Sequence, residues 1–277
     1  MKRVLITGAD GLIGTVLRER LADRYDLRFL TWQPVAGLDS HVGDIADLDA
    51  IAPAFEGIDA VVQLAGHATM DATWEQALHS NIIGIRNVFE AAARAGVERV
   101  VYASSNHAVG QFETDGLPGI YRPGQTEFPM VDHHVPWRPD SYYGVSKAFG
   151  EALGALYAEK HGMGVLAIRI GNFGDRPLDR RRLSIWISPR DFLQLVRIGL
   201  EHPEIRYEVV YGASESDRSW WDNANAYRLG YRPEDESEPF AAEILANEPE
   251  PTDLVAERFQ GGPFCSAEFT GDIERAS

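Results

Sequence analysis

The sequence predicts an α/β fold: a doubly wound parallel β-sheet covered by helices on both faces, followed by a small C-terminal lobe. Over the first 170 residues, short apolar runs alternate with longer amphipathic ones. The apolar runs are nearly continuous, which is typical of parallel strands that are buried on both faces. With 277 residues and 44% hydrophobic content, the chain is long enough for one large domain or two closely packed lobes.

The strands and helices follow from these runs in chain order. Apolar runs predict strands at residues 3–7 (RVLIT), 27–31, 60–65 (AVVQLA), 99–104 (RVVYAS) and 165–170 (VLAIRI). Amphipathic patterns between them predict helices at residues 15–24, 74–95 and 141–161.

The alternation weakens after Gly171, where a helix over 189–201 and a strand near 207–210 are predicted. Residues 111–139 are rich in Gly and Pro and predict a long loop. Residues 233–257 carry nine acidic and no basic side chains, but enough apolar ones to pack as a helix. We therefore divide the chain into a sheet domain, residues 1–171, and a C-terminal lobe, residues 172–277.

Charge and cysteine content exclude several classes of protein. The 42 acidic side chains outnumber the 26 basic ones, which gives a net charge of −16 and argues against nucleic acid or an anionic membrane as partner. A single cysteine, Cys265, makes no internal disulfide, which fits a reducing compartment. No signal-peptide core and no apolar run of about 18 residues is present, so we expect a cytoplasmic protein without a membrane span.

A glycine-rich segment, TGADGLIG at residues 7–14, joins the first strand to the first helix. Gly8 permits a tight turn, Gly11 lets the backbone approach a pyrophosphate, and Gly14 permits close packing of the helix. Leu12 and Ile13 lie inside the segment, where the helix offers amides and a partial positive charge to phosphates. This context predicts a dinucleotide site in the first domain.

The second strand ends in Leu30-Thr31-Trp32-Gln33, without the acidic residue that commonly binds the adenosine ribose. Thr31 at this position neither repels a 2′-phosphate nor binds one strongly. No Arg or Lys occurs in residues 8–14 or 31–33, which favours NAD and leaves NADP open.

Tyr143 and Lys147 form a Tyr-x-x-x-Lys pattern at the start of a predicted helix, so both side chains share one face. A neighbouring ammonium favours the phenolate form of a tyrosine, which can then act as a base. Tyr142 lacks this spacing. The turn Ser104-Ser105-Asn106-His107 ends the preceding strand at the carboxyl edge of the sheet, where open α/β folds bind ligands.

These motifs resemble the extended short-chain dehydrogenase/reductases, which have a Rossmann fold. The matching pieces are TGADGLIG, Asp44-Ile45, Leu64-Ala65-Gly66, Asn81, SSN and YGVSK. The resemblance implies that Ser105, Tyr143 and Lys147 are catalytic. It also implies that Asp44 and Ile45 flank the adenine of the cofactor and that Lys147 holds the nicotinamide ribose. Further contacts with the cofactor are implied for Leu64, Ala65, Gly66 and Asn81.

A closer resemblance is to uronate dehydrogenases, through NIIG (81–84), SSNH (104–107), RIG (169–171), LSIWIS (183–188), WWDN (220–223) and RFQGG (258–262). It implies that an enzyme of this kind oxidises C1 of a hexuronate to the lactone with NAD: tyrosine takes the hydroxyl proton while C1 gives up a hydride. The implied sugar contacts are Ser105, Asn106, His107, Asn172 and Arg181, and a guanidinium such as that of Arg181 suits a carboxylate.

The chain departs from this pattern in three places. The segment 113–134 is enlarged, and its Tyr121-Arg122-Pro123 resembles NAD-dependent glucose-6-phosphate dehydrogenases of halophilic archaea. Asn172 stands at a position where uronate dehydrogenases look to have a Ser. Thr31 stands where they look to have a ribose-binding Asp. A sugar phosphate or a sulfonated sugar therefore stays open as substrate beside the uronate.

Four arginines in residues 176–182 form the densest basic cluster of this acidic chain, and we expect at least one of them to face an anionic sugar. No His, Asp or Glu set has convincing metal-ligand spacing, so no metal is expected. Two alternatives are a nucleotide-sugar epimerase or dehydratase and a non-enzymatic dinucleotide sensor. The resemblance also implies a homo-oligomer formed through the helices at 74–95 and 141–161.

Overall fold

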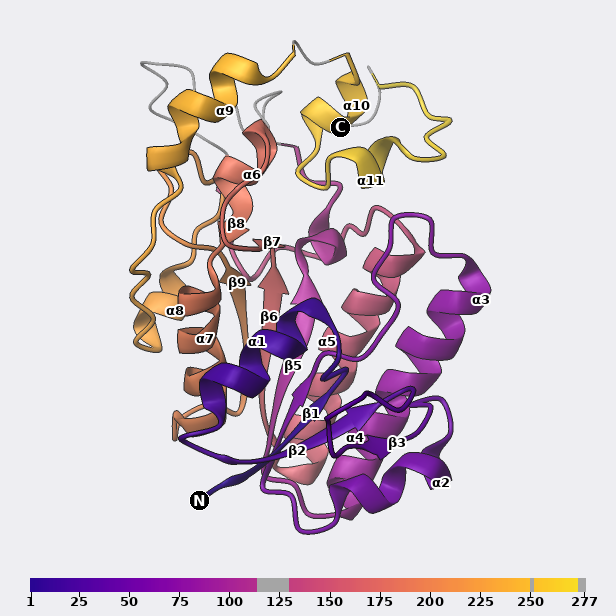
Figure 1. The fold of residues 1–277 in the computed structure, drawn as a ribbon. Helices are drawn as coiled ribbons and strands as arrows, with labels where there is room; N and C mark the ends of the chain where they lie inside the picture. Colours follow the sequence, from indigo (N-terminus) through magenta and orange to yellow (C-terminus); the bar gives the residue numbers. More distant parts are fainter. Residues whose placement is uncertain (114–129, 250–251, 274–277) are drawn as a thin grey trace.

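The computed structural model describes residues 1–113, 130–249 and 252–273. Its centre is a seven-stranded sheet in the order β3-β2-β1-β4-β5-β6-β9, with every neighbouring pair parallel. Figure 1 shows the strands running side by side with helices around them. The α/β doubly wound fold predicted from the sequence is confirmed.

The strands of this sheet are short and mostly apolar. Their bounds are β1 Arg3–Thr7, β2 Asp26–Thr31, β3 His41–Val42, β4 Ala60–Gln63, β5 Arg99–Ser105, β6 Gly164–Ile170 and β9 Tyr207–Gly212. A separate parallel pair is formed by β7 Asn172–Phe173 and β8 Trp186–Ile187. The helices are α1 Leu12–Leu21, α2 Leu48–Ile51, α3 Trp74–Gln76, α4 Gly84–Arg94, α5 Tyr142–His161, α6 Arg180–Ile185, α7 Pro189–Glu201, α8 Ala224–Arg228, α9 Ala241–Asn247, α10 Leu254–Arg258 and α11 Pro263–Ser266.

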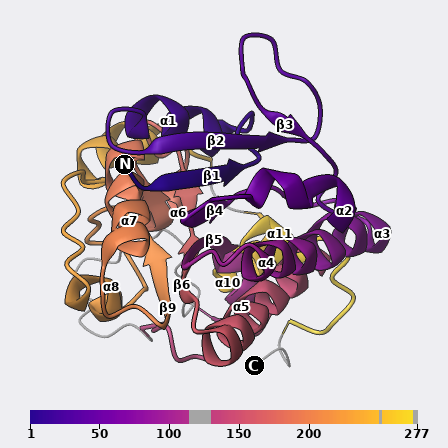
Figure 2. The ribbon, with the colours of Figure 1, turned by 90° about the horizontal axis from the view of Figure 1, so that it is seen from below.

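Successive side chains of each strand point to opposite faces, so the sheet contributes to two separate cores. On one face Ile6 and Val62 pack with the side chains of α1 and α7. On the other face Leu5 and Val61 pack with those of α4 and α5. Figure 2 shows these two helix pairs on opposite sides of the sheet.

The first helix begins at Leu12, three residues before the predicted start, because its N-cap is Gly11 in an extended conformation. The predicted helix 74–95 is one continuous segment that ends at Arg94 and contains a wider π-helical stretch, Ala77–Ile83. It starts with a capping box between Thr73 and Gln76. Strand β3 was not predicted, because two residues carry too little periodicity to be recognised.

Beyond residue 171 the chain contributes both to the layers of the central sheet and to a group of short helices above it. Helix α7 and strand β9 join the layers of the sheet, whereas α6, α9, α10 and α11 gather above the carboxyl ends of the strands (Figure 1). The division at residues 171 and 172 stays a prediction. The acidic segment 233–257 forms a 3₁₀ turn, α9 and α10 rather than one helix.

The predicted loop 111–139 falls partly outside the described residues, and so does Tyr121-Arg122-Pro123. Its described ends join the C-terminal half through single bridges, Glu113 to Phe259 and Val131 to Trp221. In the described ranges, no helix combines the length and the apolar character needed to cross a bilayer.

Candidate active site

The turn between β1 and α1 needs glycine for two physical reasons. Gly8 has φ +64°, and a Cβ on it would lie 2.9 Å from the amide nitrogen of Ala65. A Cβ on Gly14 would overlap the carbonyl oxygen of Gly8. The turn is therefore pressed against the end of β4, and the first turn of α1, which holds Leu12, Ile13 and Gly14, packs directly on it.

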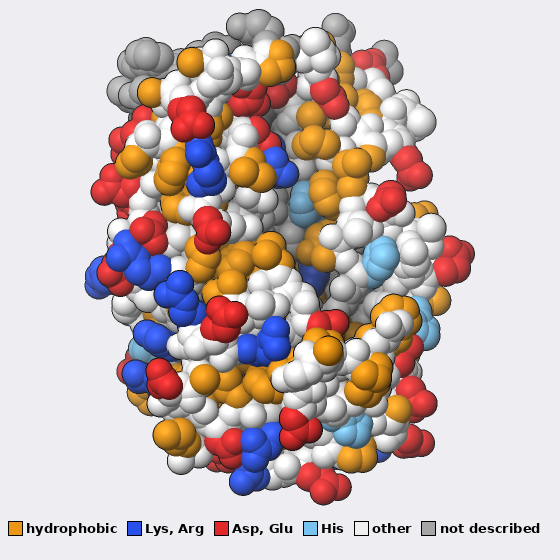
Figure 3. Space-filling model, viewed as in Figure 1, with side chains coloured by type: hydrophobic (Ala, Val, Ile, Leu, Met, Phe, Trp, Pro, Cys, Tyr) orange, Lys and Arg blue, Asp and Glu red, His pale blue; other side chains and the backbone are white. Residues whose placement is uncertain are grey.

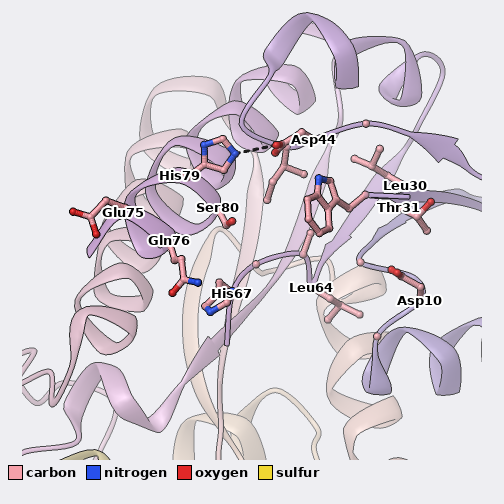
Figure 4. Close-up of a pocket in the computed structure, with 17 residues that line it drawn as sticks. Asp10, Leu30, Thr31, Asp44, Leu64, His67, Glu75, Gln76, His79 and Ser80 are labelled. Atoms are coloured by element: carbon pink, nitrogen blue, oxygen red, sulfur yellow. Dashed lines mark hydrogen bonds and ion pairs between the residues drawn. The ribbon is translucent and has the colours of Figure 1, made fainter. Parts of the chain in front are cut away.

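A cavity of about 850 Å³ opens beside this turn (Figure 4). Eight residues predicted to bind the cofactor line it: Gly8, Gly11, Thr31, Asp44, Ile45, Leu64, Ala65 and Gly66. The other predicted cofactor residues, Leu12, Ile13, Gly14, Asn81, Tyr143 and Lys147, are not among its lining residues. The glycine turn, the volume and the mixture of apolar and hydrogen-bonding groups fit a dinucleotide.

One end of the cavity is polar. Asp44 Oδ2 lies 2.9 Å from His79 Nε2, the pair joined by the dashed line in Figure 4. Burial raises the pKa of Asp44, but the amide of Ala46 and the side chain of His79 outweigh it and hold the pKa below its usual value. This carboxylate is thus an ionised hydrogen-bond acceptor in the wall of the cavity.

The end of β2 lacks the acidic residue that is found there in many dinucleotide sites. Thr31 is buried, and its hydroxyl is 2.8 Å from the hydroxyl of Ser40. Trp32 lines the cavity with 70% of its surface exposed. Sequence reasoning did not select Trp32, although a large aromatic directly after the second strand was a usable signal.

Asn81 is a buried residue that holds the loop next to the cavity in place. It is fully buried, its Oδ1 accepts a 2.7 Å hydrogen bond from the amide of His67, and its Nδ2 donates to the carbonyl of His67 at 2.8 Å. The same Nδ2 lies 3.0 Å from Ser146 Oγ on α5. Asn81 therefore links the loop after β4 to the helix that carries Tyr143.

Helix α5 brings Tyr143 and Lys147 beside the end of β5. Lys147 Nζ donates a 2.7 Å hydrogen bond to the carbonyl of Ala103 and lies 5.4 Å from the centre of the Tyr143 ring. Burial lowers the pKa of Lys147 to about 8. The Lys147 ammonium is thus buried near the end of β5 and the ring of Tyr143.

The phenol of Tyr143 is also buried, and burial raises its pKa to about 12. A hydrogen bond from Ser105 lowers this pKa, whereas the charge of Asp140 raises it. The amide of His107 is 3.3 Å from Ser105 Oγ, which caps the 3₁₀ turn Asn106–Val109. Ser105, Tyr143 and Lys147 therefore meet at one point, where a phenolate can take a proton from a bound hydroxyl.

Arg181 reaches the same end of the sheet from α6. Its Nε and Nη2 donate to the carbonyl of Gln260 at 3.0 and 2.6 Å. With the Asn106 amide turned to satisfy both groups, it donates to the carbonyl of Ile170 at 3.2 Å and accepts from Arg181 Nη2 at 3.3 Å. Burial lowers the pKa of Arg181 to about 10, and the guanidinium stays a cation at neutral pH.

Two neighbouring arginines of the cluster form ion pairs with acidic side chains. Arg176 pairs with Glu243 at 2.9 Å, and Arg182 pairs with Asp179 within one turn of α6. Asn172 begins β7, directly after β6 and therefore at the carboxyl edge of the sheet. Figure 3 shows a recess at this level, between the sheet layers and the C-terminal segments.

Two groups at this edge were missed by the sequence analysis. Asp140 contacts His107, and Phe264 stacks on the His107 ring with centroids 3.7 Å apart. Asp140 precedes the cap of α5, whereas Phe264 comes from the far end of the chain and carries no local signal. Among the described residues, no cluster of three or more His, Cys, Asp or Glu is arranged to hold a metal.

Comparison with known proteins gives consistent matches. A family model described as the NAD dependent epimerase/dehydratase family matches residues 4–189. The uronate dehydrogenase of Pseudomonas putida is 39% identical over 271 residues, covering 96% of each protein. An NAD-dependent glucose-6-phosphate dehydrogenase of Haloferax volcanii is 40% identical over 255 residues, or 87% of this chain and 96% of that protein. A mutant uronate dehydrogenase from Agrobacterium tumefaciens complexed with NAD superimposes with a TM-score of 0.87 at 37% identity, covering 96% of this chain and 97% of that one.

Proposed function

Because this chain belongs to the NAD-dependent epimerase/dehydratase family, we propose that it is an NAD-dependent sugar 1-dehydrogenase that oxidises a pyranose hexuronate to its lactone. The observation that carries the substrate class is Arg181, a partly buried cation fixed beside Asn106 at the end of the sheet. A guanidinium held in this way suits the carboxylate of a uronate. The near full-length similarity to uronate dehydrogenases supports the same substrate.

When bound, NAD supplies the hydride acceptor for C1 of the sugar. We assign its pyrophosphate to the glycine turn at Gly8 and Gly11, its adenine to the Asp44 and Ile45 end of the cavity, and its remaining contacts to Leu64, Ala65 and Gly66. Lys147 holds the ribose that lies nearest the reaction. NAD rather than NADP fits a cavity lined by Asp10, Asp44 and Glu75 without a Lys or Arg among its lining residues.

The protein's own groups manage the proton. Tyr143 in its phenolate form takes the proton of the C1 hydroxyl, and Ser105 orients that hydroxyl by a hydrogen bond. The Lys147 ammonium favours the phenolate. Asn106, His107 and Asn172 hold sugar hydroxyls, and Arg181 binds the carboxylate. These groups raise the rate by positioning and by proton transfer.

A substrate panel tests this assignment. Formation of NADH and NADPH is followed with glucuronate, galacturonate, glucose 6-phosphate, a sulfonated glucose and unsubstituted glucose. The highest kcat/KM is expected with a uronate and NAD. A preference for glucose 6-phosphate would instead assign the protein the activity of its Haloferax volcanii relative. A preference for unsubstituted glucose would contradict the role of Arg181.

Arg181 and Arg182 provide a matched pair for the same test. Arg181→Ala is expected to raise the KM for the uronate about tenfold or more, since charged hydrogen bonds contribute roughly 1.5–3 kcal/mol each. Arg182→Ala removes a surface partner of Asp179 and is expected to leave KM unchanged. Equal effects of the two substitutions would remove the structural basis for an anionic substrate. Release of no free NADH with any sugar would favour the epimerase alternative.

A further inference from the structure

Asp140 is a buried carboxylate beside the catalytic tyrosine, with a side-chain exposure of 0%. It stands directly before Ser141, the N-cap of α5, and three residues before Tyr143. An unpaired carboxylate in such a place costs several kcal/mol of folding free energy, since burial disfavours charge. Its retention therefore requires partners that hold it, and these partners indicate what it does.

Three glycines from separate parts of the chain shape the slot that holds this carboxylate. A Cβ on Gly110 or on Gly261 would overlap Asp140 Oδ2. A Cβ on Gly144 would lie 3.1 Å from Asp140 Oδ1. The end of the 3₁₀ turn, the first turn of α5 and the C-terminal segment thus all close around one side chain. No larger residue fits at Gly110 or Gly261 while Asp140 stays in place.

The carboxylate has two strong hydrogen-bond partners. His107 Nδ1 lies 2.6 Å from Oδ2, and Ser141 Oγ donates to Oδ1 at 2.9 Å. Cys265 Sγ is a weaker neighbour at 3.9 Å. The groups that act electrostatically on this pair are Tyr143 of α5, Arg181 of α6 and Cys265 of α11.

This geometry fixes the protonation pattern of the His107 ring. A carboxylate that is ionised only accepts hydrogen bonds, so a neutral imidazole that bonds to it through Nδ1 must carry its proton there, which leaves a lone pair on Nε2. The ring is held in one orientation, because it stacks on the Phe264 ring with centroids 3.7 Å apart and contacts the Tyr143 ring edge-on with centroids 5.8 Å apart. About a tenth of the His107 side chain remains exposed, which leaves room for a ligand contact.

We propose that Asp140 is a positioning residue for the sugar site: it holds His107 in the Nδ1–H tautomer so that Nε2 accepts a hydrogen bond from a sugar hydroxyl. The role of Nε2 in sugar binding rests on the proposed function, whereas the tautomer does not. Asp140 itself touches neither substrate nor cofactor. It acts on affinity and orientation through the ring that it holds.

The tautomer is tested first, in the free enzyme. Long-range ¹H–¹⁵N NMR of protein labelled at its eight histidines reports which ring nitrogen carries the proton, and His107→Gln identifies the His107 signals by their loss. The expected result at neutral or mildly alkaline pH is a protonated Nδ1 and an unprotonated Nε2. A ring protonated on Nε2 alone would overturn the proposal, whether or not any sugar is oxidised.

Kinetics test the consequence for substrate. In Asp140→Asn the side-chain amide can donate as well as accept, so the ring samples both tautomers. The KM for the uronate is then expected to rise about tenfold, since one hydrogen bond to substrate is weakened, with a smaller change in kcat and an unchanged Kd for NADH. Asp132→Asn, in the loop before α5, is the matched control and is expected to leave KM, kcat and the tautomer unchanged.

The outcomes separate the two proposals. An unchanged KM and tautomer in folded Asp140→Asn would overturn the role of Asp140. Should that variant fail to fold, the wild-type spectrum alone decides the tautomer. Wild-type enzyme with the expected tautomer but no uronate oxidation would contradict the proposed function and would leave the Asp140–His107 arrangement in place.

Discussion

Lys147 Nζ donates a 2.7 Å hydrogen bond to the main-chain carbonyl of Ala103, which ties the second turn of α5 to the last residues of β5. The bond joins the helix that carries Tyr143 to the strand that ends in Ser105. It also keeps the ammonium away from solvent, and burial lowers the pKa of Lys147 to about 8. The alignment of Lys147 and Tyr143 with the end of β5 is therefore obtained by burying a charge.

Lys147→Met is expected to stabilise the protein at pH 7 while reducing uronate oxidation at least a hundredfold. The folded-state pKa of about 8 lies below the ordinary lysine value of 10.5. Between these two values the unfolded chain binds more protons, so the wild-type free energy of unfolding rises with pH through this window. Below it, the lysine destabilises the fold by roughly 3 kcal/mol, and methionine removes this cost but loses the bond to Ala103.

Denaturant unfolding of both proteins without nucleotide, at pH 7 and near pH 10, checks this prediction. The variant is expected to be about 1–2 kcal/mol more stable at pH 7, with the difference decreasing toward pH 10. A variant that is less stable by the same amount at both pH values would show that the amine carries no burial cost.

Tyr143→Phe is expected to lower kcat about 10²- to 10⁴-fold, since general base catalysis commonly contributes that much. The Kd for NADH is expected to stay within a few-fold of wild type, because the ring and its packing are kept. Tyr142→Phe is the matched control: its side chain is half exposed and it lies outside the i, i+4 relationship with Lys147. Steady-state kinetics and nucleotide fluorescence separate the two effects.

The pH dependence of the wild type follows from the same tyrosine. Burial raises the pKa of Tyr143 to about 12, and only the deprotonated phenol accepts a proton. The kcat/KM for uronate oxidation is therefore expected to rise with pH from neutral to about pH 8, the pKa of Lys147, above which the charge that favours the phenolate is lost. A flat profile over this range would mean that proton transfer to Tyr143 does not limit the reaction.

Gly262→Ala is expected to raise the KM for the uronate about tenfold through a clash with Arg181. Gly262 has φ +62°, and a Cβ there would lie 2.6 Å from Arg181 Nε. Gly96 has φ +74° with no atom within 4 Å of the added Cβ. Alanine at either position carries a backbone cost of about 1–2 kcal/mol, but only Gly262→Ala displaces the guanidinium. Similar KM values for the two variants would show that Arg181 tolerates the shift.

Trp32→Arg is expected to lower the Kd for NADPH without improving the binding of NADH. The side chain is 70% exposed and lines the cofactor cavity, which has no Lys or Arg among its lining residues. A guanidinium there can pair with the 2′-phosphate that distinguishes NADPH. Trp74→Arg adds the same charge outside this lining and is expected to leave both affinities unchanged. Fluorescence titration with the two nucleotides provides the measurement.

Local sequence was sufficient for six of the seven strands of the central sheet and for the residues that belong to one motif. The apolar runs gave the buried strands, the glycine spacing gave the turn at Gly8, and the i, i+4 spacing put Tyr143 and Lys147 on one face of α5. Strand β3 was not predicted, because a two-residue strand shows no periodicity. The start of α1 was predicted too late, because a glycine N-cap resembles a loop.

The sequence by itself determined the fold class, the dinucleotide turn and the pairing of tyrosine with lysine, since each depends on residues a few positions apart. Only the tertiary structure decided which arginine of the basic cluster lies beside Asn106 and which side chains hold His107. Arg181 is fixed by the carbonyl of Gln260, 79 positions away, and His107 by Asp140 and Phe264. Such contacts depend on how distant segments pack in three dimensions, and no periodicity or local propensity encodes them.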